Sequence, residues 1–288
     1  MTGTDPAPGI TGATEVTGVV APDVAEALAA LLDVPAPDDG ALPLAWHWCV
    51  LLDRPRSADL GPDGHPVRGG SVAPPGPGRR RMWAGGRVEV RGPLRLGEVA
   101  TRRSRARPPV AKQGRSGPMD LVAVDHVVSQ RGEVVLVERQ DLLYREAPAV
   151  GEPPAPEPVV PVPLAAGDRP WPVTPTLLFR YSALTYNGHR IHYDRDHARR
   201  TEGYPGLVTH GPLQALAMAE AARAAGVRTR PGLVCDYRLV APLIDHQGLV
   251  ARADPAPDGS WTASVRDLGG RTTARATFSG LPPRTAMI

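Results

Sequence analysis

A proline-rich segment divides this chain of 288 residues into two parts. Ten of the 29 residues from 147 to 175 are proline. Because proline lacks a backbone N–H and fixes its own φ angle, such a segment favours neither a helix nor a sheet ladder and acts as a stiff, extended spacer. We therefore expect two halves, residues 20–146 and 176–288, joined by a linker over residues 147–175.

The first half combines an early helix with strands. A proline opens an alanine-rich apolar run that predicts a helix over residues 23–32. Alternating apolar residues on both sides of Arg131-Gly132 predict an antiparallel hairpin over residues 120–144. The WHWCVLL run at 46–52 is apolar throughout, and its pattern does not distinguish a strand from a buried helix.

The second half has a long helix followed by strands. The run PLQALAMAEAARAA predicts a helix over residues 212–225 with one apolar face, and Gly226 follows as its C-terminal cap. Strand patterns follow near residues 233–240, 248–254, 260–266 and 272–279. This order is typical of an α+β fold whose antiparallel sheet wraps around the helix, and the first half has the pattern of a degenerate copy.

Polar and aromatic residues are concentrated in FRYSALTYNGHRIHYD, residues 179–194, which we interpret as a strand leading into a loop. Its histidines offer a general base with a pKa near neutrality. Gly211 then opens the predicted helix, and the first N–H groups of a helix are free to hold a developing oxyanion. A base beside an oxyanion site indicates acyl chemistry.

The segment YSALTYNGHRIHYD, followed by VTHGPLQ, resembles the MaoC-like enoyl-CoA hydratases and hydroxyacyl-thioester dehydratases of hotdog fold. The resemblance is closest to the type 2 branch, which includes mesaconyl-C4-CoA and itaconyl-CoA hydratases. In the first half, WHW, DGHPVRGG, GRRRMWAGG and KQGRSGP resemble the same branch in order and spacing. The resemblance implies a double hotdog, two helix-in-sheet units in one chain, with a coenzyme A thioester as substrate and no metal or redox cofactor.

The family's motif places an aspartate five positions before its catalytic histidine, and here these positions hold Asn187 and His192. An amide neither takes nor gives a proton near neutral pH. The resemblance therefore implies that His192 is the general base and that Asn187 orients the attacking water through its carbonyl oxygen. The Gly211 N–H is expected to hold the thioester oxygen. Three neighbouring side chains are further candidates for substrate contact: Tyr181, His189 and His210.

Simpler structural roles compete with several of these assignments. Asn187 precedes Gly188, and Asn-Gly favours a tight turn. Gly211 suits a helix start in any protein, and Tyr181 can serve in packing alone. We expect Asp194 to cap the short helix that follows it.

The remaining composition excludes several classes of partner. The net charge is only +3, and the arginines at 79–81 and 102–107 lack the interleaved aromatic residues of a nucleic-acid site. They predict either solvated strand ends or a rim for the phosphates of coenzyme A. Cys49 and Cys235 have apolar neighbours and predict core packing. The chain has no secretion signal and no apolar run of membrane-spanning length, so we expect a cytoplasmic protein without a membrane partner.

The leading prediction is a hydro-lyase that reversibly adds water to an α,β-unsaturated acyl-CoA, with a short branched or dicarboxylic acyl group such as mesaconyl-C4. Three alternatives remain open: a dehydratase acting on acyl carrier protein thioesters, a hotdog thioesterase, and a non-catalytic acyl-thioester binder. A thioesterase usually needs a carboxylate near the helix start, and Glu220 lies about two turns from Gly211. We expect one active site per chain, in a monomer or a homodimer.

Overall fold

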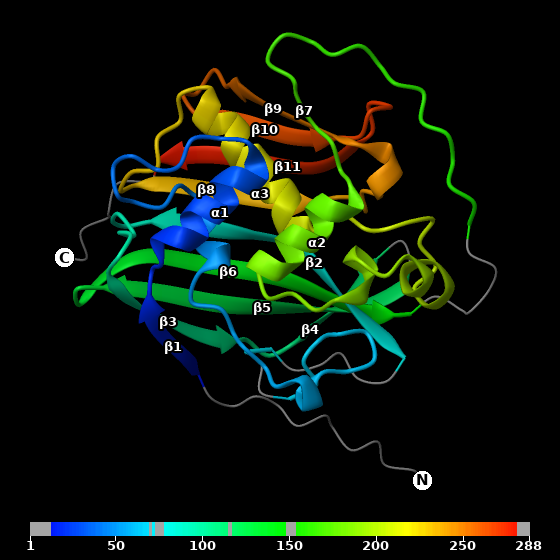
Figure 1. Cartoon of the computed structure of the whole chain (residues 1–288), viewed down its shortest axis with the longest axis horizontal. Helices are drawn as coiled ribbons and strands as arrows, with labels where there is room; N and C mark the ends of the chain where they lie inside the picture. Colours follow the sequence, from blue (N-terminus) through cyan, green and yellow to red (C-terminus); the bar gives the residue numbers. More distant parts are fainter. Residues whose placement is uncertain (1–12, 69–70, 73–77, 115–116, 148–153, 281–288) are drawn as a thin grey trace.

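The computed structural model describes residues 13–68, 71–72, 78–114, 117–147 and 154–280. These residues form one antiparallel sheet of eleven strands, and the helices cover one of its faces (Figure 1). The strand order along the sheet is β1-β3-β5-β6-β2-β8-β11-β10-β9-β7, and β4 pairs with β5 outside this path. The α+β arrangement expected from the sequence is therefore present.

Six strands come from the first part of the chain: β1 (Thr14–Val19), β2 (Arg79–Val90), β3 (Val99–Ala106), β4 (Val110–Gly114), β5 (Gly117–Gln130) and β6 (Glu133–Glu146). Five come from the second: β7 (Arg169–Trp171), β8 (Leu233–Leu239), β9 (Leu249–Pro255), β10 (Trp261–Arg266) and β11 (Thr272–Gly280). The α-helices are α1 (Pro22–Leu32), α2 (Pro175–Leu184) and α3 (Gly211–Ala224). Within the described residues, no helix has the length and apolar character needed to cross a membrane.

The two parts of the chain meet where β2 pairs with β8. Five residue pairs join these strands, from Gly85↔Arg238 to Glu89↔Val234. The seam is tight, because a Cβ atom on Gly85 would lie 2.4 Å from the Tyr237 carbonyl oxygen. The ladder therefore makes one continuous sheet out of strands from both sides of the proline-rich segment.

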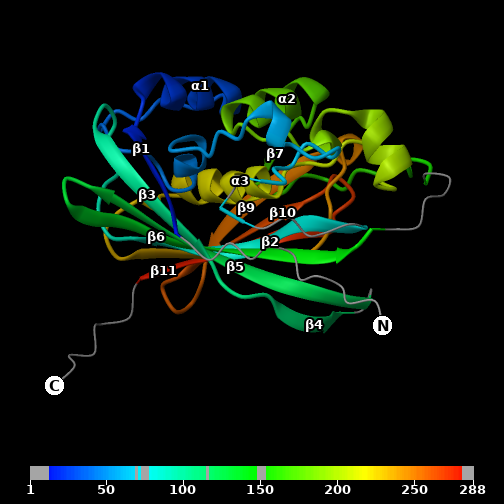
Figure 2. The same ribbon diagram turned by 90° about the horizontal axis from the view of Figure 1, so that it is seen from below.

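Helix α3 is the centre of the core. In Figure 2 it lies against the sheet, while α1 and α2 form an outer layer over it. All residues from 213 to 222 are buried, so the helix is enclosed on every side. The sequence predicted only one buried apolar face, and this expectation was wrong. Small alanine side chains permit this close packing on β9, β10 and β11. Glu220 is buried with the rest and accepts hydrogen bonds from Trp46 Nε1 (2.7 Å) and Arg223 Nη2 (2.6 Å).

Two local expectations were wrong, and each has a physical reason. Residues 179–184 are not a strand, because they belong to α2. Thr174 Oγ1 caps this helix by accepting from the Leu177 N–H at 3.1 Å, and a proline occupies its first turn. The linker also contains a strand, since β7 pairs with β9 through three residues. The division of the chain into halves remains a prediction, and β1 lies before residue 20, where the first half was expected to begin.

Other expectations are confirmed. The helix at 23–32 and the four strands after α3 are present within a few residues of their expected positions. The hairpin turns at Arg131 (φ 53°) and Gly132 (φ 82°), two positive φ angles that suit a tight hairpin. The WHWC run forms a 3₁₀ turn, Trp46–Cys49. Cys49 and Cys235 are buried and unbridged.

The buried bond between Trp46 and Glu220 generates a stability prediction. Trp46→Phe keeps an aromatic ring in the core but removes the N–H that Glu220 accepts. An unsatisfied buried acceptor costs about 1–3 kcal/mol, so the free energy of unfolding in urea should fall by about that amount. Trp171→Phe is the control, because no described residue forms a hydrogen bond with its indole N–H. Equal losses in both variants would contradict the assigned role of the bond.

Candidate active site

A cavity of about 830 Å³ opens between residues from the two parts of the chain. The second part lines it with the polar segment singled out in the sequence and with the start of α3. The first part lines it with strand residues of β2, β5 and β6 and with the loop before β2. Five of the six expected site residues line the cavity: Tyr181, Asn187, His189, His192 and Gly211.

His192 is held as a neutral base. Its Nδ1–H donates to the Val208 carbonyl oxygen at 2.7 Å, which leaves the lone pair on Nε2. The side chain is buried, and burial together with the nearby His189 lowers its pKa to about 3. The imidazole is therefore uncharged at neutral pH and can accept a proton from water.

His210 lies behind His192 and is not among the residues lining the cavity. The two rings stack with centroids 3.6 Å apart. His210 has 0% exposure and forms a 2.8 Å hydrogen bond between its Nε2 and Ser182 Oγ. Its position suits a residue that orients the His192 ring, in contrast to the expected substrate contact.

Asn187 lines the cavity, but its side chain also shapes the backbone. Its Oδ1 accepts the His189 backbone N–H at 3.0 Å, the hydrogen bond of an Asx turn. The preceding Tyr186 has a φ angle of 51°, in the left-handed region. The turn that competed with a catalytic role for Asn187 is therefore present. It sets the direction of residues 187–194, the histidine segment.

Gly211 and Tyr181 offer hydrogen-bond donors to the cavity. Gly211 begins α3, and no described residue accepts its N–H. A Cβ atom at this position would lie 2.3 Å from Leu239 Cδ1, so close packing as well as helix geometry favours glycine here. The Tyr181 hydroxyl is buried without a hydrogen-bond partner among the described residues, and burial raises its pKa well above its usual value.

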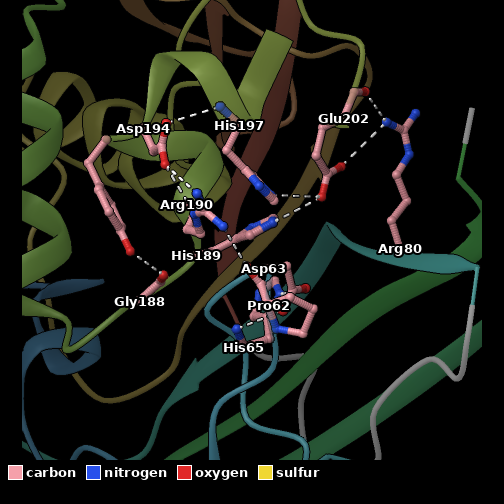
Figure 3. A network of polar contacts seen from close by, with 11 residues as sticks. Pro62, Asp63, His65, Arg80, Gly188, His189, Arg190, Asp194, His197 and Glu202 are labelled. Atoms are coloured by element: carbon pink, nitrogen blue, oxygen red, sulfur yellow. Dashed lines mark hydrogen bonds and ion pairs between the residues drawn. The ribbon is translucent and has the colours of Figure 1, made fainter. Parts of the chain in front are cut away.

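The loop before β2 brings residues to the site that the sequence analysis did not assign. Asp63 Oδ2 and His65 Nδ1 are 2.9 Å apart, and the His65 and His189 rings have centroids 3.9 Å apart (Figure 3). One ligand atom from each of Asp63, His65 and His189 lies within 4.8 Å of the others, a spacing that a metal ion could use. From the sequence, the DGH residues were noted only as part of the family resemblance. Nothing in their spacing predicts which part of the chain this loop contacts.

A carboxylate lies behind His189. Glu202 Oε1 is 3.5 Å from His189 Nε2 and 4.0 Å from His197 Nε2, and its other oxygen pairs with Arg80 Nη1 at 3.7 Å (Figure 3). Asp194 caps the following helical turn, as expected, by accepting the His197 N–H at 3.0 Å. These contacts fix the far side of the histidine segment.

The part of the cavity formed by the first half mixes apolar side chains with a buried polar cluster around Glu138. Glu138 is buried and accepts from His47 Nε2 (3.1 Å), Trp48 Nε1 (2.8 Å) and Gln140 Nε2 (2.9 Å). Although burial raises its pKa, the His47 hydrogen bond and charge hold that pKa at about 2. The carboxylate is therefore ionised in a cavity wall where a fatty acyl tunnel would be apolar.

A continuous antiparallel sheet around a central helix is the architecture of hotdog-fold proteins, a group that includes thioester hydratases and dehydratases. The profile of the Htd2 family, hydroxyacyl-thioester dehydratase type 2, matches residues 45–245. Mesaconyl-C(4)-CoA hydratase of Chloroflexus aurantiacus is 41% identical over 263 residues, covering 86% of this chain and 92% of that protein. The chain belongs to the hydroxyacyl-thioester dehydratase type 2 family and is a hydro-lyase.

Solved structures confirm the fold. HtdX from Mycobacterium tuberculosis superposes with a TM-score of 0.67 at 20% identity, covering 92% of this chain and 100% of that one. A MaoC-like dehydratase from Phytophthora capsici gives a TM-score of 0.67 at 13% identity, covering 96% and 97%. The double hotdog implied by the sequence resemblance is therefore confirmed.

The buried histidines predict a pH-dependent stability. Because His192 stays neutral in the folded protein down to a pKa of about 3, only the unfolded chain takes up its proton near pH 6.5. The unfolded state then binds more protons, so the free energy of unfolding should fall as pH decreases below about 6.5, by up to about 1.4 kcal/mol per pH unit for this residue. Urea unfolding between pH 7.5 and 5 measures the slope.

His192→Gln should reduce that slope, while His246→Gln, outside the cavity, should leave it unchanged. Carboxylates are ionised in both states over most of this range, so they contribute little to the difference. A slope that is the same in His192→Gln and the parent protein would contradict the neutral, buried state of His192.

Proposed function

We propose that the protein reversibly hydrates an α,β-unsaturated acyl-CoA with a short, polar acyl group. The observation that carries the proposal is the state of His192, which is neutral, anchored through Nδ1 and turned so that Nε2 remains available in the cavity. In hydration, Nε2 takes a proton from water as the water oxygen bonds to carbon 3. The same imidazolium then returns that proton to carbon 2.

Hydrogen-bond donors in the lining of the same cavity hold the developing enolate. We assign the Gly211 N–H, at the positive end of α3, to the thioester oxygen. The Tyr181 hydroxyl, which has no described partner, is a second donor within the same lining. His210 supports the reaction from behind by holding the His192 ring in place.

Polar groups in the cavity support a short dicarboxylic acyl group. Gln140 and His126 line its first-half wall, where they can form hydrogen bonds with a polar acyl group. Arg81 also lines the cavity, and no described carboxylate forms an ion pair with it. An acyl group such as mesaconyl-C4, the substrate named for the 41% identical relative, carries a second carboxylate that Arg81 could bind.

A carrier-protein thioester is the second candidate. Hydroxyacyl-thioester dehydratase type 2 of Schizosaccharomyces pombe is 38% identical, but over only 82 residues, 27% of each chain. Charged groups in the cavity wall, among them Glu138 and Arg81, favour the short acyl-CoA over a growing fatty acid. Catalysis without a metal or redox cofactor, a cytoplasmic location and a possible homodimer remain part of this proposal.

A thioester panel tests the function. It should contain mesaconyl-C4-CoA, itaconyl-CoA, crotonyl-CoA and a long-chain enoyl-CoA, with mass spectrometry to detect gain or loss of water. We expect the dicarboxylic thioesters to give the highest kcat/KM, and His192→Ala to reduce it by roughly 10²–10⁴-fold while remaining folded. Near-normal turnover in folded His192→Ala would remove this residue from the mechanism, and free CoA release would indicate a thioesterase.

Asn187 variants separate proton transfer from turn formation. Asn187→Asp keeps an oxygen that can accept the His189 N–H, so we expect most activity to remain. Asn187→Ala loses that hydrogen bond and misplaces the histidine segment, with an expected decrease in kcat of roughly 10²-fold. Steady-state kinetics on the best panel substrate measure both effects. An inactive, folded Asn187→Asp would instead show that the amide N–H₂ group is required.

A further inference from the structure

In the proposed hydration, one hydrogen of the attacking water has no assigned hydrogen-bond acceptor. A water that attacks carbon 3 has two hydrogens, and His192 Nε2 accepts only one of them. The Asn187 oxygen already accepts the His189 N–H, so it is turned toward the backbone. A second acceptor for the water must come from another part of the cavity wall.

His65 has the required chemistry and location. It lines the same cavity as His192, and His189 contacts both rings, with centroids 3.9 Å from His65 and 5.4 Å from His192. Because His65 Nδ1–H donates to the Asp63 carboxylate at 2.9 Å, its lone pair is on Nε2. No hydrogen bond from the described residues engages that nitrogen.

Asp63 fixes His65 through a second contact as well. Asp63 Oδ1 accepts the His65 backbone N–H at 3.0 Å, so one carboxylate holds both the backbone and the ring. Burial and the guanidinium of Arg81 lower the pKa of His65 well below its usual value, which keeps the ring neutral. A neutral imidazole oriented by a carboxylate is a competent hydrogen-bond acceptor for water.

The loop that carries His65 is built into the site. Gly64 has a φ angle of 86°, and a Cβ atom there would lie 1.8 Å from the Gly188 carbonyl oxygen. The Arg190 backbone N–H donates to the Asp63 carbonyl oxygen at 2.9 Å, and Arg190 Nη1 donates to the Pro62 carbonyl oxygen at 3.0 Å. The histidine segment and the loop thus hold each other through backbone contacts.

We propose that His65 Nε2 accepts the second hydrogen of the attacking water and that Asp63 positions His65 for this role; the inference rests on the proposed hydratase function. One O–H bond of the water breaks as its proton moves to His192, and the oxygen bonds to carbon 3. The hydrogen held by His65 stays on the new hydroxyl group. The electron pair of the double bond moves onto the thioester and then forms the C2–H bond with the proton from His192.

A metal ion explains the same cluster less well. The ligand atoms of Asp63, His65 and His189 are close enough, but Asp63 and His65 already satisfy each other. The charges of Arg81 and Arg190 nearby oppose a divalent cation. Dialysis against EDTA should therefore leave kcat unchanged; loss of activity that Zn²⁺ restores would overturn the water-acceptor role.

The test compares His65→Ala, His65→Gln and Asp63→Asn on the best thioester of the panel. Removing the acceptor should lower kcat by roughly 10²-fold with little change in KM. Glutamine places an oxygen near the position of Nε2, so His65→Gln should retain most of the kcat that His65→Ala loses. Asp63→Asn should lower kcat by about 10- to 100-fold. His246→Ala is the matched control, and it should retain full activity.

Nitrogen-15 NMR of the histidines supplies a readout that a structural role would not change. In the parent protein, the His65 signals should show a protonated Nδ1 and a bare Nε2, and Asp63→Asn should shift that balance. Full kcat in folded His65→Ala, or an Nε2-protonated His65 in the parent protein, would overturn the inference alone. No hydration of any thioester by the parent protein would overturn the proposed function together with it.

Discussion

The pairing of β2 with β8 is the constraint on which the rest of the structure depends. It joins strands from both sides of the proline-rich segment into one sheet and leaves no free edge at the seam. Because the sheet is continuous, the loop before β2 meets the histidine segment at the backbone contact of Gly64 and Gly188. The cavity therefore has two walls of different origin, one carrying the base and the other the buried cluster around Glu138.

Burial is the second determinant of the site. His192 and His210 stack in a place where charging either ring is costly, and the pKa values of both are lowered mainly by burial. Each ring has a neutral partner, the Val208 carbonyl for His192 and the Ser182 hydroxyl for His210. The fold thus maintains a base that stays uncharged at physiological pH, and the cost of burying a charged ring makes the folded protein less stable in acid.

Much of the fold was predictable from local patterns, but the composition of the site was only partly predictable. Alternating apolar residues predicted the 120–144 hairpin, and the alanine-rich run predicted α3. The α2 segment was misjudged because its polar and aromatic residues obscured the Thr174 cap and the proline in its first turn. His65 was not identified as a site residue, since its proximity to His189 arises from long-range contacts such as that between Gly64 and Gly188.

A crystal structure of the protein with a 3-hydroxyacyl-CoA product tests the account most directly. We expect the 3-hydroxyl oxygen to lie within about 3.2 Å of His192 Nε2 and the thioester oxygen within about 3.1 Å of the Gly211 nitrogen. The acyl group should extend toward Arg81, where its second carboxylate can pair with the guanidinium. A product bound with its hydroxyl away from His192, or with its thioester away from the start of α3, would contradict the central claim.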